Sequence, residues 1–239
     1  MRQESPAWID RADNVNSYLA TCITFINEIA TICENVGADA GEVERGLRGD
    51  VRIGPKAYIK PGNAFAGGTL ARDVNYLCQI AQNKDIEIPL LSHVIASNQS
   101  HKHWVQHALT RHLGVLSDKT VGVLGLTYTP DTNTLRRSAS VELCQWLHAQ
   151  GATVRVYDPN ISILPEDLKQ FITLTSDMNT VYKSASALII ANEHKMFKLI
   201  DVDGVRERMK MPLIIDQNGW VSTLQNMEGI TYVQLGSGL

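Results

Sequence analysis

The sequence lacks the features that would place it outside the ordinary class of globular proteins. No apolar run among its 239 residues is long enough to span a bilayer, and the first residues carry no apolar core of a signal peptide. Neither sign of charge dominates, since the net charge is −3 and the isoelectric point is near 6.2. A basic footprint for nucleic acid is therefore excluded. We expect a cytoplasmic protein that binds neither membranes nor nucleic acid.

Cysteine is scarce, and its spacing excludes the common cysteine-based sites. The four cysteines are Cys22, Cys33, Cys78 and Cys144, and no two of them form a C-x-x-C pair. Each lies in a helical pattern, so we expect small core side chains in a reducing compartment.

Histidine is the only metal-ligating residue type that gathers in one segment. His101, His103, His107 and His112 fall in one predicted helix, where His103 and His107 share a face. No carboxylate or cysteine near them completes a recognisable ligand pattern, so a solvated amphipathic helix is the better interpretation. The sequence therefore predicts no metal site.

The first half of the sequence is dominated by helical patterns. Helices are predicted over residues 9–36, 39–47, 72–82 and 90–112. The first contains no proline, and Gly37 supplies its stop. A loop rich in Gly and Pro occupies residues 48–68. We expect an all-α domain over residues 1–116.

The second half alternates strands with helices. Strand candidates are residues 120–126, 153–157, 187–191, 213–216 and 231–235. Helical patterns lie between them over residues 138–150, 178–183 and 195–209. This alternation predicts a Rossmann-like, doubly wound parallel sheet over residues 117–239, and hence an α/β protein. A ligand is expected at the carboxyl ends of the strands, near the switch in strand order.

The dinucleotide fingerprint G-x-G-x-x-G is missing from the predicted sheet domain. Gly122 and Gly125 flank the end of its first strand, but the spacing does not fit the fingerprint. A stand-alone NAD-binding module is therefore the least favoured hypothesis.

Several segments carry a specific likeness in a fixed order. They are a helix motif at residues 19–39, the loop Gly-Asn-Ala-Phe-Ala-Gly-Gly-Thr-Leu-Ala-Arg-Asp at residues 62–73, the segment Gly-Leu-Thr-Tyr-Thr-Pro-Asp-Thr at residues 125–132, continuing to Arg136 and Ser138, and Tyr-Asp-Pro at residues 157–159. In order and spacing they resemble the central and carboxyl-terminal parts of the UDP-glucose/GDP-mannose dehydrogenase family, the nucleotide-sugar 6-dehydrogenases. The family's amino-terminal dinucleotide-binding domain has no counterpart in this sequence.

The resemblance implies catalytic positions at Asn16, Thr69 and Asp73. In the family a cysteine at the position of Thr69 captures the sugar aldehyde, and a threonine hydroxyl is a far weaker nucleophile. The family's lysine falls on Ala12. Cys22 is six helical positions from Asn16 and so faces another side of its helix, which excludes it as a replacement nucleophile. The structural alternative is that Asn16 and Asp73 are ordinary helix residues.

The resemblance also implies substrate-binding positions, which are Arg52, Tyr58, Phe65, Gly67, Gly68, Thr129, Arg136 and Gln217. Gly67 and Gly68 would let the backbone approach a diphosphate, although a tight turn explains them equally well. Arg52 would complete the site of a neighbouring subunit, or else be a surface arginine. Thr129 and Gln217 stand where the family has a lysine and an arginine.

Two main hypotheses follow. In the first, the chain is part of an NAD-dependent UDP-sugar 6-dehydrogenase of polysaccharide biosynthesis, with NAD bound outside this sequence and no cofactor bound by this chain alone. In the second, it is a catalytically inactive relative that binds a nucleotide sugar or acts as a scaffold. Both predict a homodimer through the long first helix.

Overall fold

The computed structural model describes residues 11–66 and 68–238, and it divides into two compact units. Unit 1 contains the chain up to Lys102 together with residues 236–239, and unit 2 contains residues 103–235. The chain therefore passes between the units twice. The predicted domain boundary at residues 116 and 117 lies beyond the first of these crossings and stays a prediction.

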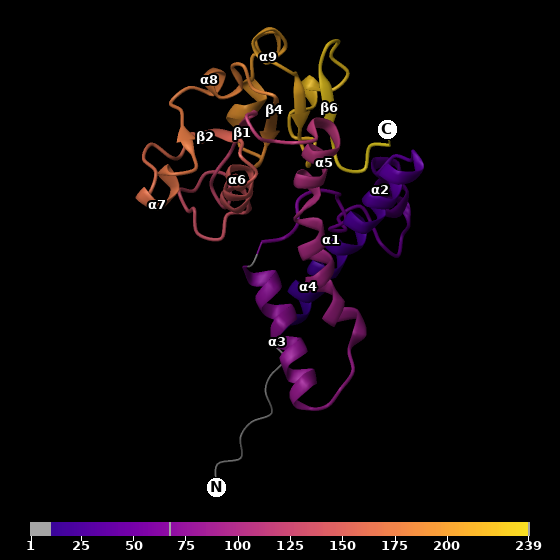
Figure 1. The fold of residues 1–239 in the computed structure, drawn as a ribbon. Coiled ribbons are helices and arrows are strands. Elements are labelled where there is room, and N and C mark those ends of the chain that lie inside the picture. The colour runs from indigo at the N-terminus through magenta and orange to yellow at the C-terminus, as the bar shows by residue number, and fades with distance from the viewer. Residues whose placement is uncertain (1–10, 67, 239) are drawn as a thin grey trace. The chain divides into compact units, whose positions relative to one another are not determined.

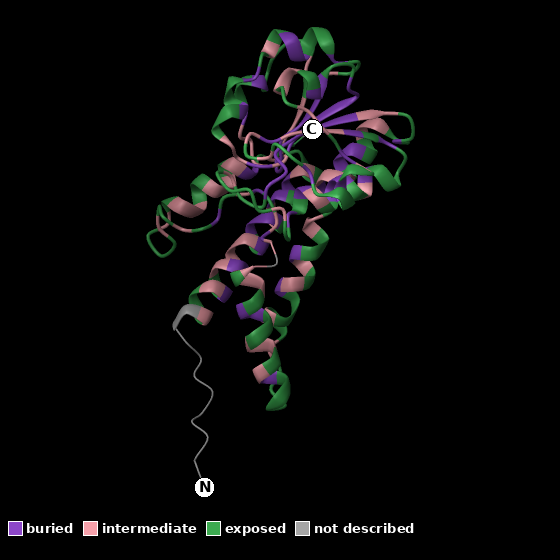
Figure 2. Cartoon of the chain, turned by 90° about the vertical axis from the view of Figure 1, so that its left-hand side faces the viewer, coloured by how far each residue is buried: buried purple, intermediate pink, exposed green. Residues whose placement is uncertain are grey.

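Unit 1 is helical in its described part. Its helices are α1 (Arg11–Val36), α2 (Ala40–Gly49), α3 (Thr69–Asn83) and α4 (Pro89–His101). Helices α1, α3 and α4 pack on one another, as Figure 1 shows. Their contact is centred on Ala20, Phe65, Val74 and Val94, all of which are buried. In Figure 2, which colours each residue by its burial, buried residues alternate with intermediate and exposed ones along these helices.

Helix α1 is long because nothing in its sequence interrupts it. It has no glycine or proline over 26 residues, which gives a length of about 39 Å. It ends where Gly37 takes a φ of +73° and the Ala38 N–H donates to the Cys33 carbonyl at 2.9 Å. This is a Schellman motif, in which glycine relieves the strain of a left-handed residue. The predicted start at Ile9 lies outside the described residues.

Among the described residues, unit 2 is built on a six-stranded sheet, with the strand order β3-β2-β1-β4-β5-β6 and all neighbours parallel. The strands are β1 (Thr120–Leu124), β2 (Thr153–Tyr157), β3 (Thr173–Leu174), β4 (Ala187–Ile190), β5 (Leu213–Ile215) and β6 (Thr231–Val233). Neighbouring β1 and β4 mark the switch point, because the chain builds outward from them in both directions. The α/β fold class is confirmed.

Helices cover both faces of this sheet. They are α5 (Trp104–Leu113), α6 (Ala139–Ala149), α7 (Glu166–Lys169), α8 (Met178–Tyr182), the 3₁₀ helix η1 (Lys195–Leu199), α9 (Val202–Arg208) and the 3₁₀ helix η2 (Ser222–Leu224). Figure 1 places α5 and α6 on one face and α8 and α9 on the other. The central strand β4 is wholly buried, and each Leu or Ile buried in this way contributes about 1.5–3 kcal/mol.

Two predicted helices are broken in the structure. The helix expected over 90–112 is α4 followed by α5, with Lys102 and His103 in a turn between them. The helix expected over 195–209 is η1 followed by α9, whose first turn is capped by the Asp201 carboxylate. Apolar residues continue through the break between η1 and α9, so periodicity alone gave the wrong answer there, whereas residues 97–103 before α5 are all polar and the prediction of one helix passed over that signal. The predictions also missed β3, α7 and η2, which are too short to show a period.

The C-terminal segment rejoins unit 1 at the junction of α1 and α2. Gly236 accepts a hydrogen bond from the Ala40 N–H at 2.9 Å and donates its own N–H to Glu34 Oε1 at 2.9 Å. Ser237 forms an antiparallel bridge with Asp39. Gly236 has a φ of +76°, and a Cβ there would collide with the Cβ of Ala40, so only glycine fits.

Candidate functional site

The structure brings Asn16 and Asp73 into direct contact. The Asn16 Nδ2 amide donates to Asp73 Oδ2 at 2.6 Å, joining α1 to α3. The Asp73 side chain is buried, and its other oxygen, Oδ1, accepts a bond from Arg72 Nε at 2.6 Å. The Arg72 guanidinium, aided by Asn16, lowers the pKa of the Asp73 carboxyl despite its burial. Asp73 is therefore an ionised carboxylate with both oxygens occupied.

Thr69 is the first residue of α3, one turn before Asp73 and so on the same side of the helix. The predicted helix began three residues too late. Gly68 is the N-cap and has no side chain, and no other side chain caps the first turn. The amides of a first turn have no partner within the helix, so these can donate to an anionic ligand. Gly67 lies outside the described residues.

The loop before α3 is held by side chains that the sequence analysis did not single out. Asn27 and His101 bond to the backbone of Gly62, and Asn98 bonds to the backbone of Phe65. The Phe65 ring is buried in the contact between the helices. No local motif marks these three polar residues, because each comes from another part of the chain.

Two other predicted positions of unit 1 stand apart from this contact. Arg52 binds Asp50 through Nη2–Oδ2 at 2.7 Å and Nε–Oδ1 at 3.0 Å, and its side chain is exposed. Its hydrogen bonding to the Asp50 carboxylate raises the pKa of Arg52. Tyr58 is also exposed. Their assignment to a substrate stays a prediction.

The carboxyl edge of the unit 2 sheet is organised by Asp158, which follows β2. Its Oδ2 accepts the N–H of Leu126 at 2.7 Å, the N–H of Thr127 at 2.9 Å and the Thr127 hydroxyl at 3.0 Å. Its Oδ1 accepts the Asn160 N–H at 2.9 Å. In dinucleotide-binding folds an acid at the end of β2 binds the ribose. Here both oxygens are occupied by the chain itself, so these residues do not fit NAD.

At the switch point, the residues that follow β1 and β4 pack closely on each other. Gly125, after β1, has a φ of +97°, and a Cβ there would lie 2.5–2.7 Å from atoms of the Asn192 side chain. Asn192 is buried and donates to the Thr127 hydroxyl at 3.3 Å. Glycine at this position therefore serves close packing of the two loops.

The remaining predicted positions lie in the loops after β1 and β5. Thr129 and Arg136 are exposed in the first loop, where the Thr129 carbonyl accepts a bond from the Thr132 hydroxyl at 2.8 Å. Gln217 is buried and follows Asp216, whose Oδ2 accepts the Val221 N–H at 2.7 Å. All three lie at the carboxyl edge, where a doubly wound sheet binds its ligand.

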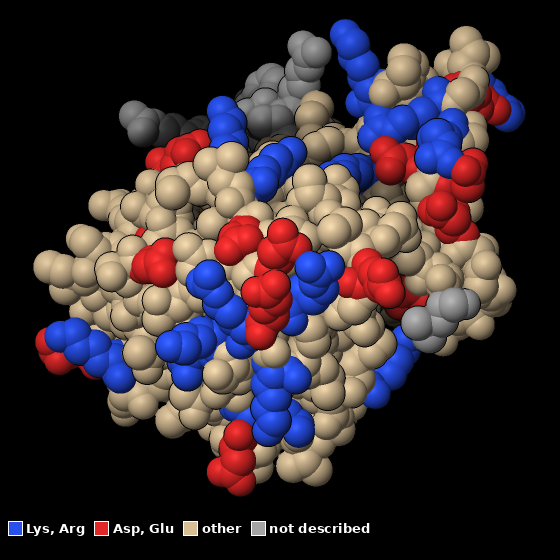
Figure 3. Space-filling view, turned by 90° about the horizontal axis from the view of Figure 1, so that it is seen from above, with Lys and Arg blue, Asp and Glu red and all other residues tan. Residues whose placement is uncertain are grey.

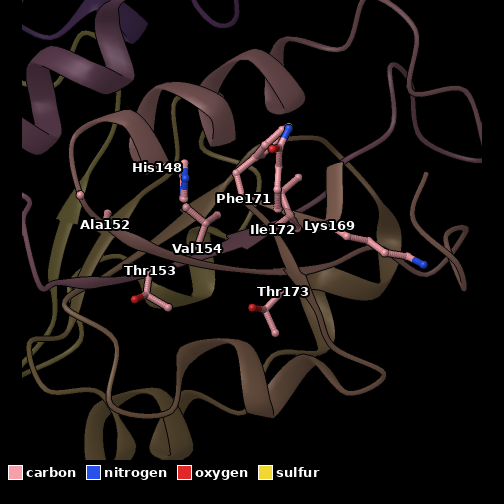
Figure 4. A pocket seen from close by; sticks show the side chains of 10 residues that line it. His148, Ala152, Thr153, Val154, Lys169, Phe171, Ile172 and Thr173 are labelled. Carbon is pink, nitrogen blue, oxygen red and sulfur yellow. The ribbon is translucent and has the colours of Figure 1, made fainter. Parts of the chain in front are cut away.

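Unit 2 also has a cavity of about 330 Å³ at the opposite, amino edge of β2 and β3. Figure 4 shows its lining, which includes His148, Thr153, Phe171 and Thr173. The His148 and Phe171 rings lie 6.2 Å apart between centroids. The cavity contains none of the predicted site residues, and its edge is not the one where such sheets bind ligands.

Three further features bear on the predicted ligands and partners. Within residues 11–66 and 68–238, no group of three His, Cys, Asp or Glu side chains could hold a metal ion. No helix in this described part of the chain is long and apolar enough to cross a membrane. The face in Figure 3 carries Lys and Arg intermixed with Asp and Glu.

Two family models match the chain in succession. The central domain of the UDP-glucose/GDP-mannose dehydrogenase family matches residues 14–100, and the UDP binding domain of that family matches residues 122–223. The fold described above, with a helical unit followed by a doubly wound sheet, agrees with this order. The chain belongs to the UDP-glucose/GDP-mannose dehydrogenase family.

Individual relatives support this membership. The UDP-glucose 6-dehydrogenase TuaD of Bacillus subtilis (strain 168) is 33% identical over 221 residues, which are 91% of this chain and 47% of that enzyme. A UDP-glucose 6-dehydrogenase of Rhizobium meliloti (strain 1021) is 32% identical over 223 residues, 92% of this chain and 51% of that enzyme. The chain thus spans about half the length of the relatives it matches.

Solved structures show the same fold. A UDP-glucose dehydrogenase from Pyrobaculum islandicum superimposes with a TM-score of 0.78 at 24% identity, covering 95% of this chain and 50% of that one. A UDP-D-ManNAc dehydrogenase from Pyrococcus horikoshii gives a TM-score of 0.75 at 21% identity, with coverage of 95% and 51%. At these identities the likeness extends to the fold alone.

Proposed function

We propose that this chain forms the sugar-nucleotide-binding and dimerising part of a UDP-sugar 6-dehydrogenase, acting in the cytoplasm. The observation that carries the proposal is the contact of Asn16 with Asp73 beside Thr69, at the uncapped start of α3. The first-turn amides of α3 offer donors to an anionic ligand, beside a polar pair that fixes α3 against α1. NAD and the oxidation itself belong to a dinucleotide-binding domain of the kind that the family resemblance implies.

The site is better suited to binding than to covalent capture of an aldehyde. A threonine nucleophile needs an adjacent general base. Asp73 is on the same side of α3 as Thr69, but Asn16 and Arg72 occupy its oxygens, and the lowered pKa of its carboxyl makes it a weak base. With Thr69 the capture step is therefore expected to be slow. This favours the second candidate function, a nucleotide-sugar-binding relative without the covalent step.

The first experiment measures binding. UDP-glucose and UDP are titrated into the chain by calorimetry, with the Asp73→Ala variant as the negative control for the unit 1 site. We expect both ligands to bind the wild type and UDP-glucose to bind the variant more weakly. If millimolar concentrations of both ligands give no heat and leave Tm unchanged, the binding proposal is wrong.

The second experiment separates the two candidate functions. A dinucleotide-binding domain of a family enzyme is supplied, and NADH formation from UDP-glucose and NAD is followed for the wild type and for Thr69→Cys. A gain of turnover in Thr69→Cys supports a dehydrogenase part that lacks only its nucleophile. Binding of UDP-glucose without turnover by either protein supports the binding relative.

We also propose that the chain dimerises through α1. The apolar side chains of Tyr18, Phe25 and Ile32 repeat every seven residues along this helix and are exposed, Tyr18 at 68% and Ile32 at 57%. A helix with such a second apolar line needs a partner surface in addition to the packing of its own unit. A second copy of the chain is the partner that the family resemblance implies.

A further inference from the structure

The backbone of the loop before α3 is bonded by side chains from two helices. The Gly62 N–H donates to Asn27 Oδ1 at 3.0 Å, and the Gly62 carbonyl accepts from His101 Nε2 at 2.8 Å. The Phe65 N–H donates to Asn98 Oδ1 at 2.9 Å, and the Phe65 carbonyl accepts from Asn98 Nδ2 at 2.8 Å. Thus α1 supplies one of these side chains and α4 supplies two.

Asn98 satisfies both the N–H and the carbonyl of Phe65, as the backbone of a neighbouring strand would do in a sheet. A carboxamide offers one acceptor and a donor side by side, which match the N–H and C=O of a single extended residue. Asn98 and Phe65 are both buried, so water cannot replace these bonds when they are lost. The Phe65 ring packs with Ala20 and Val74, which keeps the loop from sliding along the helices.

The bonded loop is directly joined to the start of α3. Two residues separate Phe65 from Gly68, and the Gly68 N–H donates to the Ala66 carbonyl at 2.8 Å. So short a connection couples the position of Phe65 to that of the first residue of the helix, Thr69. A shift of the loop therefore moves the uncapped amides that begin α3.

We propose that Asn27, Asn98 and His101 form a positioning clamp that holds the loop, and with it the first turn of α3, in place for the nucleotide sugar. The inference rests on the proposed binding function, and it deepens that function by adding residues that no ligand contact would identify. None of the three is a catalytic residue, since each acts on the ligand through the backbone that it holds.

The test compares Asn98→Ala with Gln99→Ala, a matched control that removes the exposed carboxamide of the next residue in α4. Calorimetry gives the Kd of UDP-glucose, and thermal unfolding gives Tm. We expect Asn98→Ala to raise Kd tenfold or more, while Gln99→Ala leaves it within twofold of the wild type. An unchanged Kd in a folded Asn98→Ala protein would overturn the clamp.

A second pair of variants keeps the test decisive if Asn98→Ala fails to fold. His101→Ala removes the donor to the Gly62 carbonyl, whereas His101→Gln places an amide nitrogen near the position of Nε2. We expect Kd to rise in His101→Ala and to recover in His101→Gln. Loss of affinity without such recovery would mean that bulk, not the hydrogen bond, matters at this position, and the clamp would be wrong.

Amide hydrogen exchange separates failure of the clamp from failure of the proposed function. If the wild type binds no UDP-glucose, the binding proposal is wrong, and the clamp is judged by the exchange of the Gly62 and Phe65 amides, which donate to Asn27 and Asn98. These amides should exchange at least tenfold faster in Asn98→Ala than in Gln99→Ala. Equal exchange in the two variants would overturn the clamp whatever the ligand.

Discussion

Asp73 shows how one buried charge is made tolerable. Burying a lone carboxylate is costly, and here a guanidinium and an amide satisfy its two oxygens. The Arg72 side chain is largely exposed, so its Coulomb attraction is screened and the pair adds only modestly to stability. The bond from Asn16, which is partly shielded from water, adds to this stabilisation.

Removing the Asn16 amide is therefore expected to destabilise the protein. Asn16→Ala leaves Asp73 Oδ2 without its partner, and losing a hydrogen bond to a charged group costs about 1.5–3 kcal/mol. Asn35→Ala is the matched control, because Asn35 is an exposed asparagine of the same helix. Urea unfolding gives the free energy of unfolding of each variant. Equal stability of the two variants would show that the Asn16–Asp73 bond contributes nothing.

The same carboxylate predicts a pH dependence. Arg72 and Asn16 lower the pKa of Asp73 in the folded state below the unfolded value of about 3.9. The ionised form thus stabilises the fold fully above that unfolded value, and the contribution is lost as the pH falls through the lower, folded pKa. Urea unfolding from pH 7 to pH 3 should show a smaller acid loss in Asp73→Asn than in the wild type. An equal loss of unfolding free energy with falling pH in the two proteins would contradict this prediction.

At the scale of elements, the start of each helix depends on its cap. Helix α6 begins at Ser138, whose hydroxyl accepts the Ser140 N–H at 3.2 Å and donates to the Leu126 carbonyl at 2.7 Å. Its first turn is thereby satisfied by the chain itself. Helix α3 begins after Gly68 without any side-chain cap. This difference is why the proposed ligand contact lies at α3 and not at α6.

The return of the C-terminal segment to unit 1 predicts a strong effect at Gly236. Gly236→Ala combines a left-handed residue with a collision against Ala40, for a combined cost of about 2–4 kcal/mol. Gly229→Ala is the control, since Gly229 has a similar φ of +80° but its nearest neighbours, at 3.5 Å and beyond, leave room for a Cβ. Urea unfolding should show Gly236→Ala to be the less stable variant. The reverse order would show that the contact with Ala40 relaxes freely.

The apolar line on α1 predicts a change of oligomeric state. Phe25→Glu places a charge in the middle of the line and should weaken the proposed dimer at least tenfold, because burying an unpaired charge is unfavourable. Ile163→Glu makes the same change at an exposed apolar residue of unit 2 and serves as the control. Sedimentation equilibrium at micromolar concentrations measures the dimerisation of the wild type and of both variants. A wild type that is already monomeric would refute the dimer.

At the scale of the whole molecule, the chain forms two compact units, and its last residues belong to the first. Deleting residues 236–239 removes the bonds to Glu34 and Ala40 but none within the sheet. Hydrogen exchange should therefore speed up at Ala38 and Ala40 and stay unchanged in β4. Uniformly faster exchange would show that the two units unfold together.

Much of the architecture could be predicted from the sequence because its elements are periodic or capped. The pattern of 153–157 gave β2 with its correct bounds, and Asp39 caps α2 as expected. The break at Ile200 was missed because apolar residues continue on both sides of it, and the break at Lys102 was missed although residues 97–103 are all polar. The position of Thr69 as the first residue of α3 was missed as well, because Gly68 gives no capping signal.

The sequence by itself determined the family and the α/β class, and it predicted Asn16, Thr69 and Asp73 as one set, because these depend on local pattern and order. Only the tertiary structure showed that Asp73 Oδ2 is bonded by Asn16, that both oxygens of Asp158 are bonded by the chain itself, and that Asn98 satisfies the backbone of Phe65. The bonds of Asn16 with Asp73, of Leu126 with Asp158 and of Asn98 with Phe65 each join residues that are far apart in the sequence. The packing of the folded chain decides which distant residues pair in this way, so the pairing cannot be predicted from local sequence.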